Sequence, residues 1–379
     1  MKVVNILHHT TPSSQKMEDV LFDGWQARFG LQIKKQYPKV DIECWLPSRV
    51  GGQVFKRNSL TFRTIHAIQP SFHSTICPSI LTELRKSQEK DMLVHVFGER
   101  SFLTYFLLSM RRLTREFPIV VHHLGAGGGR GYFGGKFISA GFSNLESLVL
   151  PSADLIYTLS SVRLSEMNRF GVPKQKLKMG RWGVDLDFFN PLDKSECKKR
   201  LGISQDVKVV LYVGRFSHLR GLEQIIRSTK ELSRKMDIEL VAVGGSQSDS
   251  LSALVNKNLK HYKYRIPLTE MPQYYNAADV FAWYVDSDAY MYAGTGISPL
   301  EAFACGIPVV SNTLVNLREP MSPDMGVIPR SRNDLTRDIQ QAMETSRRDT
   351  IRKYAERNFD WFSISRETMG DYDRLLTDR

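Results

Sequence analysis

The sequence predicts an α/β protein with two domains. Its 379 residues exceed the usual size of one domain and are enough for two hydrophobic cores. Short apolar runs typical of buried strands alternate with helical patterns along the whole chain, which favours sheets covered by helices. There is no internal repeat, which excludes a solenoid. The hydrophobic content of 42% and the charged content of 24% are ordinary for a globular protein.

The N-terminal half begins with an expected strand at Val3 to Leu7, which is too short for the apolar core of a secretory signal. A later expected strand, 91–98, carries His95, for which we expect a structural role. The densest apolar run, 102–110, is too short to span a membrane. Four cysteines lack any spacing typical of zinc ligands or of a disulfide framework, so we expect reduced thiols in a cytoplasmic protein: Cys44, Cys77, Cys197 and Cys305.

The positive charge is concentrated in the N-terminal half. Residues 1–186 carry 25 Lys and Arg against 14 Asp and Glu, whereas residues 187–379 carry 27 against 26. Such a balance indicates an anionic ligand or an anionic membrane surface. The segment Phe102 to Phe117 is apolar and ends in three arginines, so it is either a helix at a membrane interface or a core helix with a basic end. Nucleic acid is disfavoured because no known binding motif is present.

A buried strand is expected at Pro118 to Leu124, with His122 and His123 at its end. Ligands of parallel sheets bind at the carboxyl ends of strands, so these histidines are candidate site residues, although a packed histidine would fit the pattern too. The glycine-rich run 125–135 follows. Its match to G-x-G-x-x-G is discounted because no acidic residue follows at the usual distance. Arg130 and Lys136 in or beside this run could meet a phosphate group.

The second half contains two candidate anion sites. A strand at Val209 to Val213 leads into Gly214 and Arg215, and Arg220 precedes a helix expected over 222–236. Two arginines on a glycine-punctuated turn favour a bound phosphate over two solvated surface residues.

The other site is the helix that follows Gly294-Thr295-Gly296-Ile297. The sequence predicts Ser298 as its N-cap and Gly306 just past its end. The start of such a helix attracts anions. Glu301 stands three residues after Ser298, so a capping box that merely closes the helix is the alternative interpretation.

This helix resembles the donor-site signature of retaining glycosyltransferases of the GT-B fold, family four (glycosyl transferases group 1). Glu301 matches the second glutamate of the family pattern, and Ala302 to Val309 matches the run that follows it. The turn after Val213 resembles the phosphate-binding turn of the family. Three further segments resemble family segments in the expected order: 153–160, 183–191 and 271–279.

The resemblance implies two Rossmann-like domains that face each other across a cleft. It places an acceptor-binding domain at 1–186, a sugar-nucleotide domain at 187–360 and a last helix at 361–379 that crosses back to the first domain. It implies transfer of a sugar, a hexose by expectation, from a nucleotide sugar to an acceptor hydroxyl with retention of configuration and without a metal. The acceptor is expected to be a glycan or a lipid-linked or anionic molecule, reached from the inner face of the membrane.

The family pattern also assigns roles to individual residues. The expected catalytic residues are His123, Arg215 and Arg220. The expected donor-binding residues are Gly214, Gly294, Thr295, Gly296, Ile297, Ser298 and Glu301. On the acceptor side we expect His122, Gly127 and Arg130.

The chain departs from the family pattern at several positions. Ala293 stands where the family has its first glutamate, and Asp286 or Asp288 in a longer loop could replace it. The run 8–16 replaces the usual Gly-Gly loop. Two other functions therefore stay open, a nucleotide-sugar epimerase of the same fold and a non-catalytic partner subunit.

Overall fold

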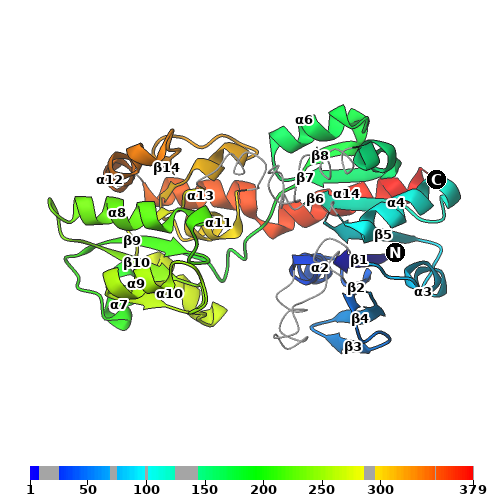
Figure 1. Ribbon diagram of the computed structural model, residues 1–379, viewed down its shortest axis with the longest axis horizontal. Coiled ribbons are helices and arrows are strands. Elements are labelled where there is room, and N and C mark those ends of the chain that lie inside the picture. The colour runs from blue at the N-terminus through cyan, green and yellow to red at the C-terminus, as the bar shows by residue number, and fades with distance from the viewer. Residues whose placement is uncertain are drawn as a thin grey trace. The chain divides into compact units, whose positions relative to one another are not determined.

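The protein divides into two compact units (Figure 1). Unit 1 comprises Met1–Gly180 and Phe362–Arg379, and unit 2 comprises Arg181–Trp361. The computed structural model describes residues 1–7, 25–68, 75–98, 101–123, 144–285, 295–345 and 347–378. The first unit thus ends at residue 180, where the sequence analysis placed the boundary at 186.

The elements of unit 1 are β1 (Lys2–Leu7), α2 (Trp25–Gln36), β2 (Asp41–Ser48), β3 (Val54–Arg57), β4 (Leu60–His66), α3 (Ile80–Lys86), β5 (Met92–Phe97), α4 (Phe102–Thr114), β6 (Ile119–His123), α6 (Ser161–Arg169), β7 (Leu155–Thr158), β8 (Leu177–Met179) and most of α14 (Trp361–Thr377). The elements of unit 2 are α7 (Lys194–Leu201), β9 (Lys208–Val213), α8 (Leu222–Leu232), β10 (Ile238–Val243), α9 (Ser252–Asn258), β11 (His261–Lys263), α10 (Met271–Ala277), β12 (Val280–Ala282), α11 (Ile297–Ala304), β13 (Val309–Val310), β14 (Gly326–Val327), α12 (Leu335–Thr345) and α13 (Arg348–Phe359). Short 3₁₀ turns lie between them.

Unit 1 is built on an eight-stranded sheet in the order β3-β4-β2-β1-β5-β6-β7-β8. All neighbours pair in parallel except β3 and β4, which form an antiparallel hairpin. Every residue of β1 and of β5 is buried, as expected for central strands covered on both faces. β7 lies within the segment 153–160, and β8 follows it at the edge of the sheet. Three residues of mixed polarity give too weak a pattern to predict β8 from sequence.

Aromatic rings and two histidines pack between the sheet of unit 1 and the C-terminal helix α14. His95 on β5 and His122 on β6 stack at 5.5 Å between ring centroids, and Phe97 stacks on both. Burial lowers the pKa of His122 to about 3 and holds that of His95 well below its ordinary value. Both rings are therefore neutral near pH 7.

The last helix, α14, packs on unit 1 through buried polar side chains. Tyr372 Oη lies 2.6 Å from His95 Nδ1, and Tyr157 donates a hydrogen bond of 2.7 Å to Asp371 Oδ2. Lys178 Nζ lies 2.5 Å from the other carboxylate oxygen of Asp371. The break between α13 and α14 falls at Asp360.

Unit 2 contains a six-stranded parallel sheet in the order β11-β10-β9-β12-β13-β14. From β9 the chain continues through β10 to β11 at one edge of the sheet. It then returns to β12, on the other side of β9, and continues through β13 to β14 at the opposite edge. This is the doubly wound Rossmann order, in which ligands bind outside the carboxyl ends of the two strands where the direction reverses. The fold therefore places the candidate site of unit 2 at the ends of β9 and β12.

No helix among the described residues is long and apolar enough to cross a membrane.

The buried histidines predict that unit 1 loses stability in acid. The unfolded chain takes up protons below about pH 6.5, whereas the buried rings do not, so the free energy of unfolding falls as the pH drops toward 3. Replacing His122 with Phe removes one titrating group while keeping a ring in the stack. We expect His122→Phe to weaken the loss of stability between about pH 6.5 and about pH 5 by about 2 kcal/mol, measured by denaturant unfolding. The exposed His66, replaced by Gln, is the control, and an equal effect of both changes would contradict the interpretation.

Candidate functional site

The turn after β9 presents two arginines at the reversal point of the sheet. Gly214 follows the strand directly, and the hydroxyl of Tyr212 donates a hydrogen bond of 2.5 Å to the carbonyl oxygen of Arg215. This bond fixes the backbone while the Arg215 side chain stays 79% exposed. Arg220 ends a 3₁₀ turn, His218–Arg220, that leads through Gly221 into α8. The predicted positions of both arginines on one turn are thus reproduced.

Asp249 holds this turn from the neighbouring loop after β10. Its Oδ2 accepts hydrogen bonds from the backbone N–H groups of Phe216 at 2.9 Å and Ser246 at 3.1 Å. Burial alone would raise the pKa of Asp249, but these bonds outweigh it, so the carboxylate stays ionised. Arg215 lies 3.9 Å away at the edge of this cluster. Sequence reasoning missed Asp249, because nothing local marks a loop aspartate as the partner of a turn 33 residues earlier.

The ring of Trp283, at the end of β12, is the second support of the site. The guanidinium of Arg220 lies over this ring, 4.6 Å from its centroid, a favourable cation–π geometry. Gly296 lies against the same ring, since a Cβ added there would fall 2.4 Å from a ring carbon. Trp283 therefore joins the arginine turn to the start of α11. The sequence analysis did not predict a role for Trp283. In the sequence it merely follows the apolar strand β12, which marks the end of a strand and nothing more.

The start of α11 differs from the sequence prediction. The N-cap is Gly296, with φ 85° and ψ 164°, and no side chain caps the helix, so Ser298 lies inside the first turn. That backbone region is accessible essentially only to glycine. The capping-box interpretation of Ser298 and Glu301 is wrong, because contact with Trp283 selects Gly296 as the helix start. Ile297 and Ser298 follow in the first turn, and Thr295 is held by a mutual contact with Thr313.

Glu301 is buried on the inner side of α11. The hydroxyl of Tyr275 on α10 donates to its Oε2 at 2.6 Å. Burial and the nearby Glu301 charge raise the pKa of Tyr275 well above its ordinary value, so Tyr275 stays a donor. The bond sets the orientation of the carboxylate, a role for Tyr275 that the sequence did not reveal.

Other predicted residues lie apart from this cluster or outside the described residues. His122 is 1% exposed and belongs to the ring stack of unit 1, which corrects the expectation that it meets an acceptor directly. His123 ends β6, but its side chain lies outside the described part of the chain. Seven other residues named in the sequence analysis also lie outside the described residues: Gly127, Arg130, Lys136, Asp286, Asp288, Ala293 and Gly294.

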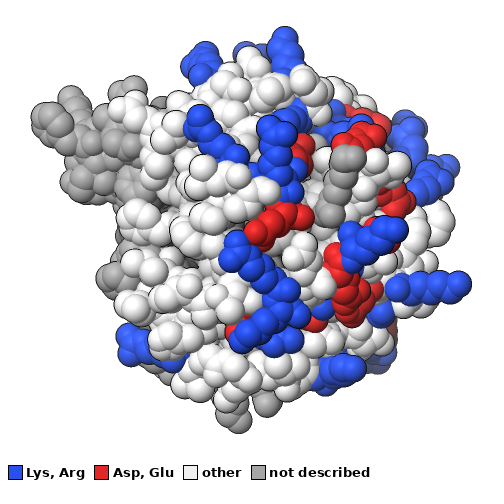
Figure 2. Space-filling view, turned by 90° about the vertical axis from the view of Figure 1, so that its right-hand side faces the viewer, with Lys and Arg blue, Asp and Glu red and all other residues white. Residues whose placement is uncertain are grey.

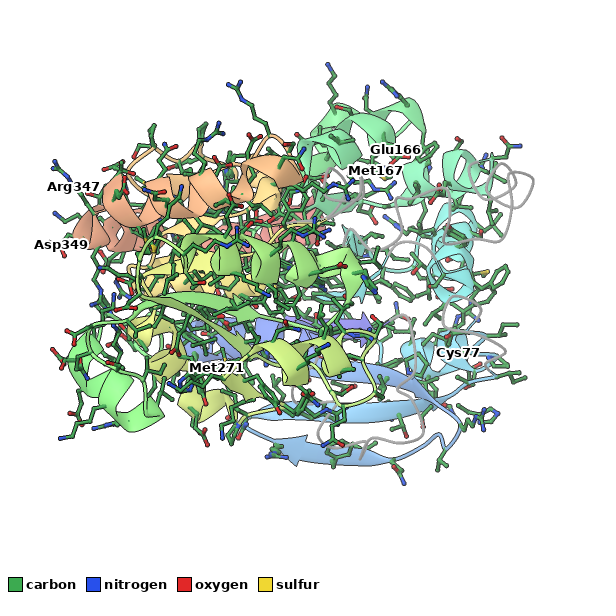
Figure 3. All side chains as sticks on the ribbon, turned by 60° about the vertical axis from the view of Figure 1, so that its left-hand side comes forward. Cys77, Glu166, Met167, Met271, Arg347 and Asp349 are labelled. Atoms are coloured by element: carbon green, nitrogen blue, oxygen red, sulfur yellow. The ribbon has the colours of Figure 1, made fainter. Side chains whose placement is uncertain are left out.

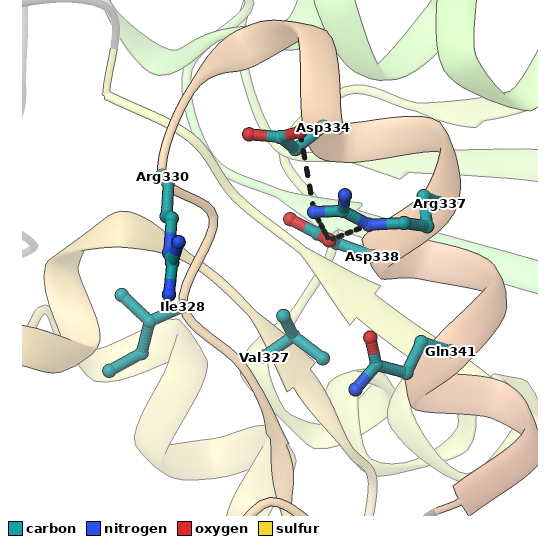
Figure 4. Close-up of a pocket in the computed structure, with 7 residues that line it drawn as sticks. All are labelled: Val327, Ile328, Arg330, Asp334, Arg337, Asp338 and Gln341. Atoms are coloured by element: carbon teal, nitrogen blue, oxygen red, sulfur yellow. Dashed lines mark hydrogen bonds and ion pairs between the residues drawn. The ribbon is translucent and has the colours of Figure 1, made fainter.

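A cavity of about 540 Å³ lies elsewhere in unit 2, between the end of β14 and α12 (Figure 4). In it, Arg337 contacts both Asp334 and Asp338, and burial raises the pKa of Asp338. None of the predicted site residues lines it. Among the described residues, no three His, Cys, Asp or Glu side chains gather in a metal-binding group.

The contact between Gly296 and Trp283 predicts a large cost for any side chain at position 296. We expect Gly296→Ala to lower the free energy of unfolding of unit 2 by about 2–4 kcal/mol, from overpacking and backbone strain together. Gly202 is the matched control: its φ of 68° is also positive, but an added Cβ would meet nothing within 4 Å. Gly202→Ala should cost only about 1 kcal/mol in the same denaturant titration. Equal costs at the two positions would contradict the penalty expected from the Trp283 contact.

Comparison with known proteins agrees with this architecture. Residues 193–358 match the family model "Glycosyl transferases group 1". A D-inositol 3-phosphate glycosyltransferase of Kineococcus radiotolerans is 27% identical over 269 residues, covering 62% of this chain and 60% of the relative. A GDP-mannose-dependent monoacylated alpha-(1-6)-phosphatidylinositol monomannoside mannosyltransferase of Corynebacterium glutamicum is 30% identical over 156 residues. This match covers 38% of this chain and 41% of the relative. The chain thus spans 60% and 41% of the two relatives, less than two thirds of each.

A solved structure extends the similarity to the whole chain. Sucrose-phosphate synthase of Thermosynechococcus elongatus superimposes with a TM-score of 0.74 at 18% identity, covering 100% of both chains. Such low identity establishes the fold alone, and the fold is GT-B, with two α/β domains built on parallel sheets. Residues 193–358 thus resemble the glycosyl transferases group 1 family, and the chain as a whole has the GT-B fold.

Proposed function

We propose that the protein is a glycosyltransferase that moves a sugar from a nucleotide-sugar donor to an acceptor hydroxyl with retention of configuration. The observation that carries this proposal lies at the reversal point of the unit 2 sheet, where Arg220, on the segment after β9, lies over the Trp283 ring against which the start of α11 packs. The relative from Corynebacterium glutamicum is GDP-mannose-dependent by name, which supports a nucleotide-sugar donor.

The charges of this cluster suit a nucleoside diphosphate. The exposed guanidinium of Arg215 and the ring-stacked guanidinium of Arg220 would contact the pyrophosphate, and the first turn of α11 would add its dipole. As the bond between the anomeric carbon and the phosphate oxygen breaks, negative charge grows on the departing diphosphate. Donors already held in place stabilise that charge most in the transition state. Two arginines would supply the charge that a metal supplies in other transferases, so the proposed reaction is metal-independent.

Glu301 would accept hydrogen bonds from the hydroxyl groups of the donor ribose. Its carboxylate is already oriented by Tyr275 at 2.6 Å, so little reorganisation is needed on binding. The acceptor oxygen would then attack the anomeric carbon on the face that the diphosphate leaves. The acceptor proton would pass to the leaving phosphate oxygen, which balances the reaction.

The acceptor is proposed to bind unit 1, with His123, Gly127 and Arg130 among the residues that contact it. The excess of basic residues in 1–186 supports an anionic or lipid-linked acceptor at the inner face of a membrane. A phosphatidylinositol mannoside is the acceptor in the name of one relative, and an inositol phosphate appears in the name of the other.

Donor binding can be tested without an acceptor. A panel of UDP- and GDP-sugars should raise the melting temperature of the wild type for one nucleotide class, since ligand at about 100 times its Kd adds about 2.7 kcal/mol of stability. The shift should be lost in Glu301→Ala. A panel without any shift would favour the non-catalytic partner subunit.

Removing either arginine should slow transfer. We expect Arg215→Ala and Arg220→Ala each to lower kcat/KM by about 10²-fold, the scale for loss of one charge-stabilising donor. Arg227 on α8 is a matched control, because it is 78% exposed and sits one to two turns from Arg220. Product analysis with a radiolabelled donor measures the rate. Sugar interconversion without acceptor would identify an epimerase, and unchanged rates in both variants would exclude the proposed charge stabilisation.

A further inference from the structure

Helix α4 of unit 1 has two apolar faces. Its inner face packs into the core through Leu103, Leu107 and Leu108, all at most 2% exposed. Its outer face carries Phe102, Phe106 and Leu113, which are 44%, 43% and 77% exposed. Spacings of four and seven residues place these three side chains on one stripe of the helix. The core-helix interpretation of this segment is therefore correct for one face only.

An apolar groove adjoins the stripe. It has a volume of about 380 Å³ and lies between α4 and the segment before α3, where Phe102 and Phe106 face Ile76, Cys77 and Pro78. Cys77 is labelled in Figure 3. Ile76 is 47% exposed, so the apolar area continues beyond the helix. Contiguous exposed apolar area of this kind marks an interaction surface more often than scattered single side chains do.

The helix is held rigidly. Ser101 caps its start by accepting a hydrogen bond of 3.1 Å from Thr104 N, and Arg115 ends it in the left-handed conformation. Arg111 donates two hydrogen bonds to Asp154, at 2.8 and 2.7 Å. This ion pair ties the helix to the segment before β7.

Two other arginines stay available at the same end of α4. Arg112 donates to the carbonyl oxygen of Leu148 at 3.3 Å, and no carboxylate of the described residues pairs with Arg112 or Arg115. Figure 2 views the side on which α3 and α4 lie, where Lys and Arg side chains alternate with Asp and Glu side chains and with uncharged areas. Apolar side chains next to uncompensated cations fit a surface that is apolar inside and anionic at its boundary.

We propose that unit 1 docks on an anionic lipid bilayer through the α4 surface, defined by Ile76, Phe102, Phe106, Leu113, Arg112 and Arg115. The apolar side chains enter the boundary of the acyl chains, and the two arginines meet lipid phosphates. The surface deepens the proposed function, because it would bring the enzyme to a lipid-linked acceptor. Its binding to lipid needs neither donor nor acceptor, so the two proposals can fail separately.

Vesicle co-sedimentation of the full chain tests the surface. Phosphatidylcholine vesicles containing phosphatidylglycerol should bind the wild type, and pure phosphatidylcholine vesicles should bind it at least several-fold more weakly. The double variant Phe102→Ser/Phe106→Ser should lose about tenfold or more in partitioning. Arg112→Glu/Arg115→Glu should lose a similar factor. Raising the ionic strength from about 0.1 M to about 1 M should weaken wild-type binding.

Matched variants outside the surface control for general effects. Phe362→Ser removes an aromatic that is 59% exposed, and Arg234→Glu/Lys235→Glu reverses two exposed charges of unit 2. Both should bind vesicles as the wild type does. Absence of wild-type binding to anionic vesicles, or an equal loss in these controls, overturns the proposal. A dimer that dissociates only in Phe102→Ser/Phe106→Ser would assign the surface to a second copy of the chain and overturn it as well.

A second measurement leaves the apolar stripe intact. Ser109 lines the groove, so Ser109→Cys labelled with an environment-sensitive dye reports directly on insertion. The native cysteines are all buried, and burial raises the pKa of the nearby Cys77 to about 12, which keeps it unreactive. Anionic vesicles should shift the dye emission to the blue. Emission that stays unchanged while the protein co-sediments would show that another surface binds lipid.

Discussion

The packing of the Gly296 backbone on the Trp283 ring is the contact on which the candidate site depends. One indole joins three segments that are distant in sequence: the end of β12 that carries it, the start of α11 and the turn that carries Arg220. The ring is 6% exposed, so its position is fixed by the core of unit 2 rather than by solvent-facing contacts. The core thereby sets where a cation and a helix start lie relative to each other, which is what an anionic ligand requires.

The acidic side chains of the site are buried and hydrogen-bonded, whereas the Arg215 side chain is exposed. The carboxylates of Asp249 and Glu301 are buried and held by neutral donors, namely backbone N–H groups and the Tyr275 hydroxyl. Neutral donors orient an acid without cancelling a cation. The charge of Arg215 is therefore opposed only weakly, by Asp249 at 3.9 Å, and the turn keeps a positive field at the strand ends.

Sequence reasoning predicted the parts of the site that depend on local signals. The strand before Gly214, the helix around Glu301 and the left-handed Gly306 follow from periodicity and turn chemistry, and all are present. It failed where distant residues decide. Ser298 satisfies the local rule for an N-cap, yet Trp283 selects Gly296. His122 stands at a strand end, where ligands usually bind, yet stacking with His95 and Phe97 makes it part of the core. No local pattern records such contacts.

The C-terminal segment Phe362–Arg379 is part of unit 1. Tyr372 reaches His95 on the central strand β5, and Asp371 accepts a hydrogen bond from Tyr157 on β7. Removing the end of α14 would leave these buried polar atoms without their partners, a cost that apolar packing elsewhere in unit 1 cannot replace. Within unit 2, Val184 N donates to Phe359 O at 2.9 Å, so the two points where the chain passes between units are tied together. The polar partners of His95 and Tyr157 are therefore in place only after unit 2 has been synthesised.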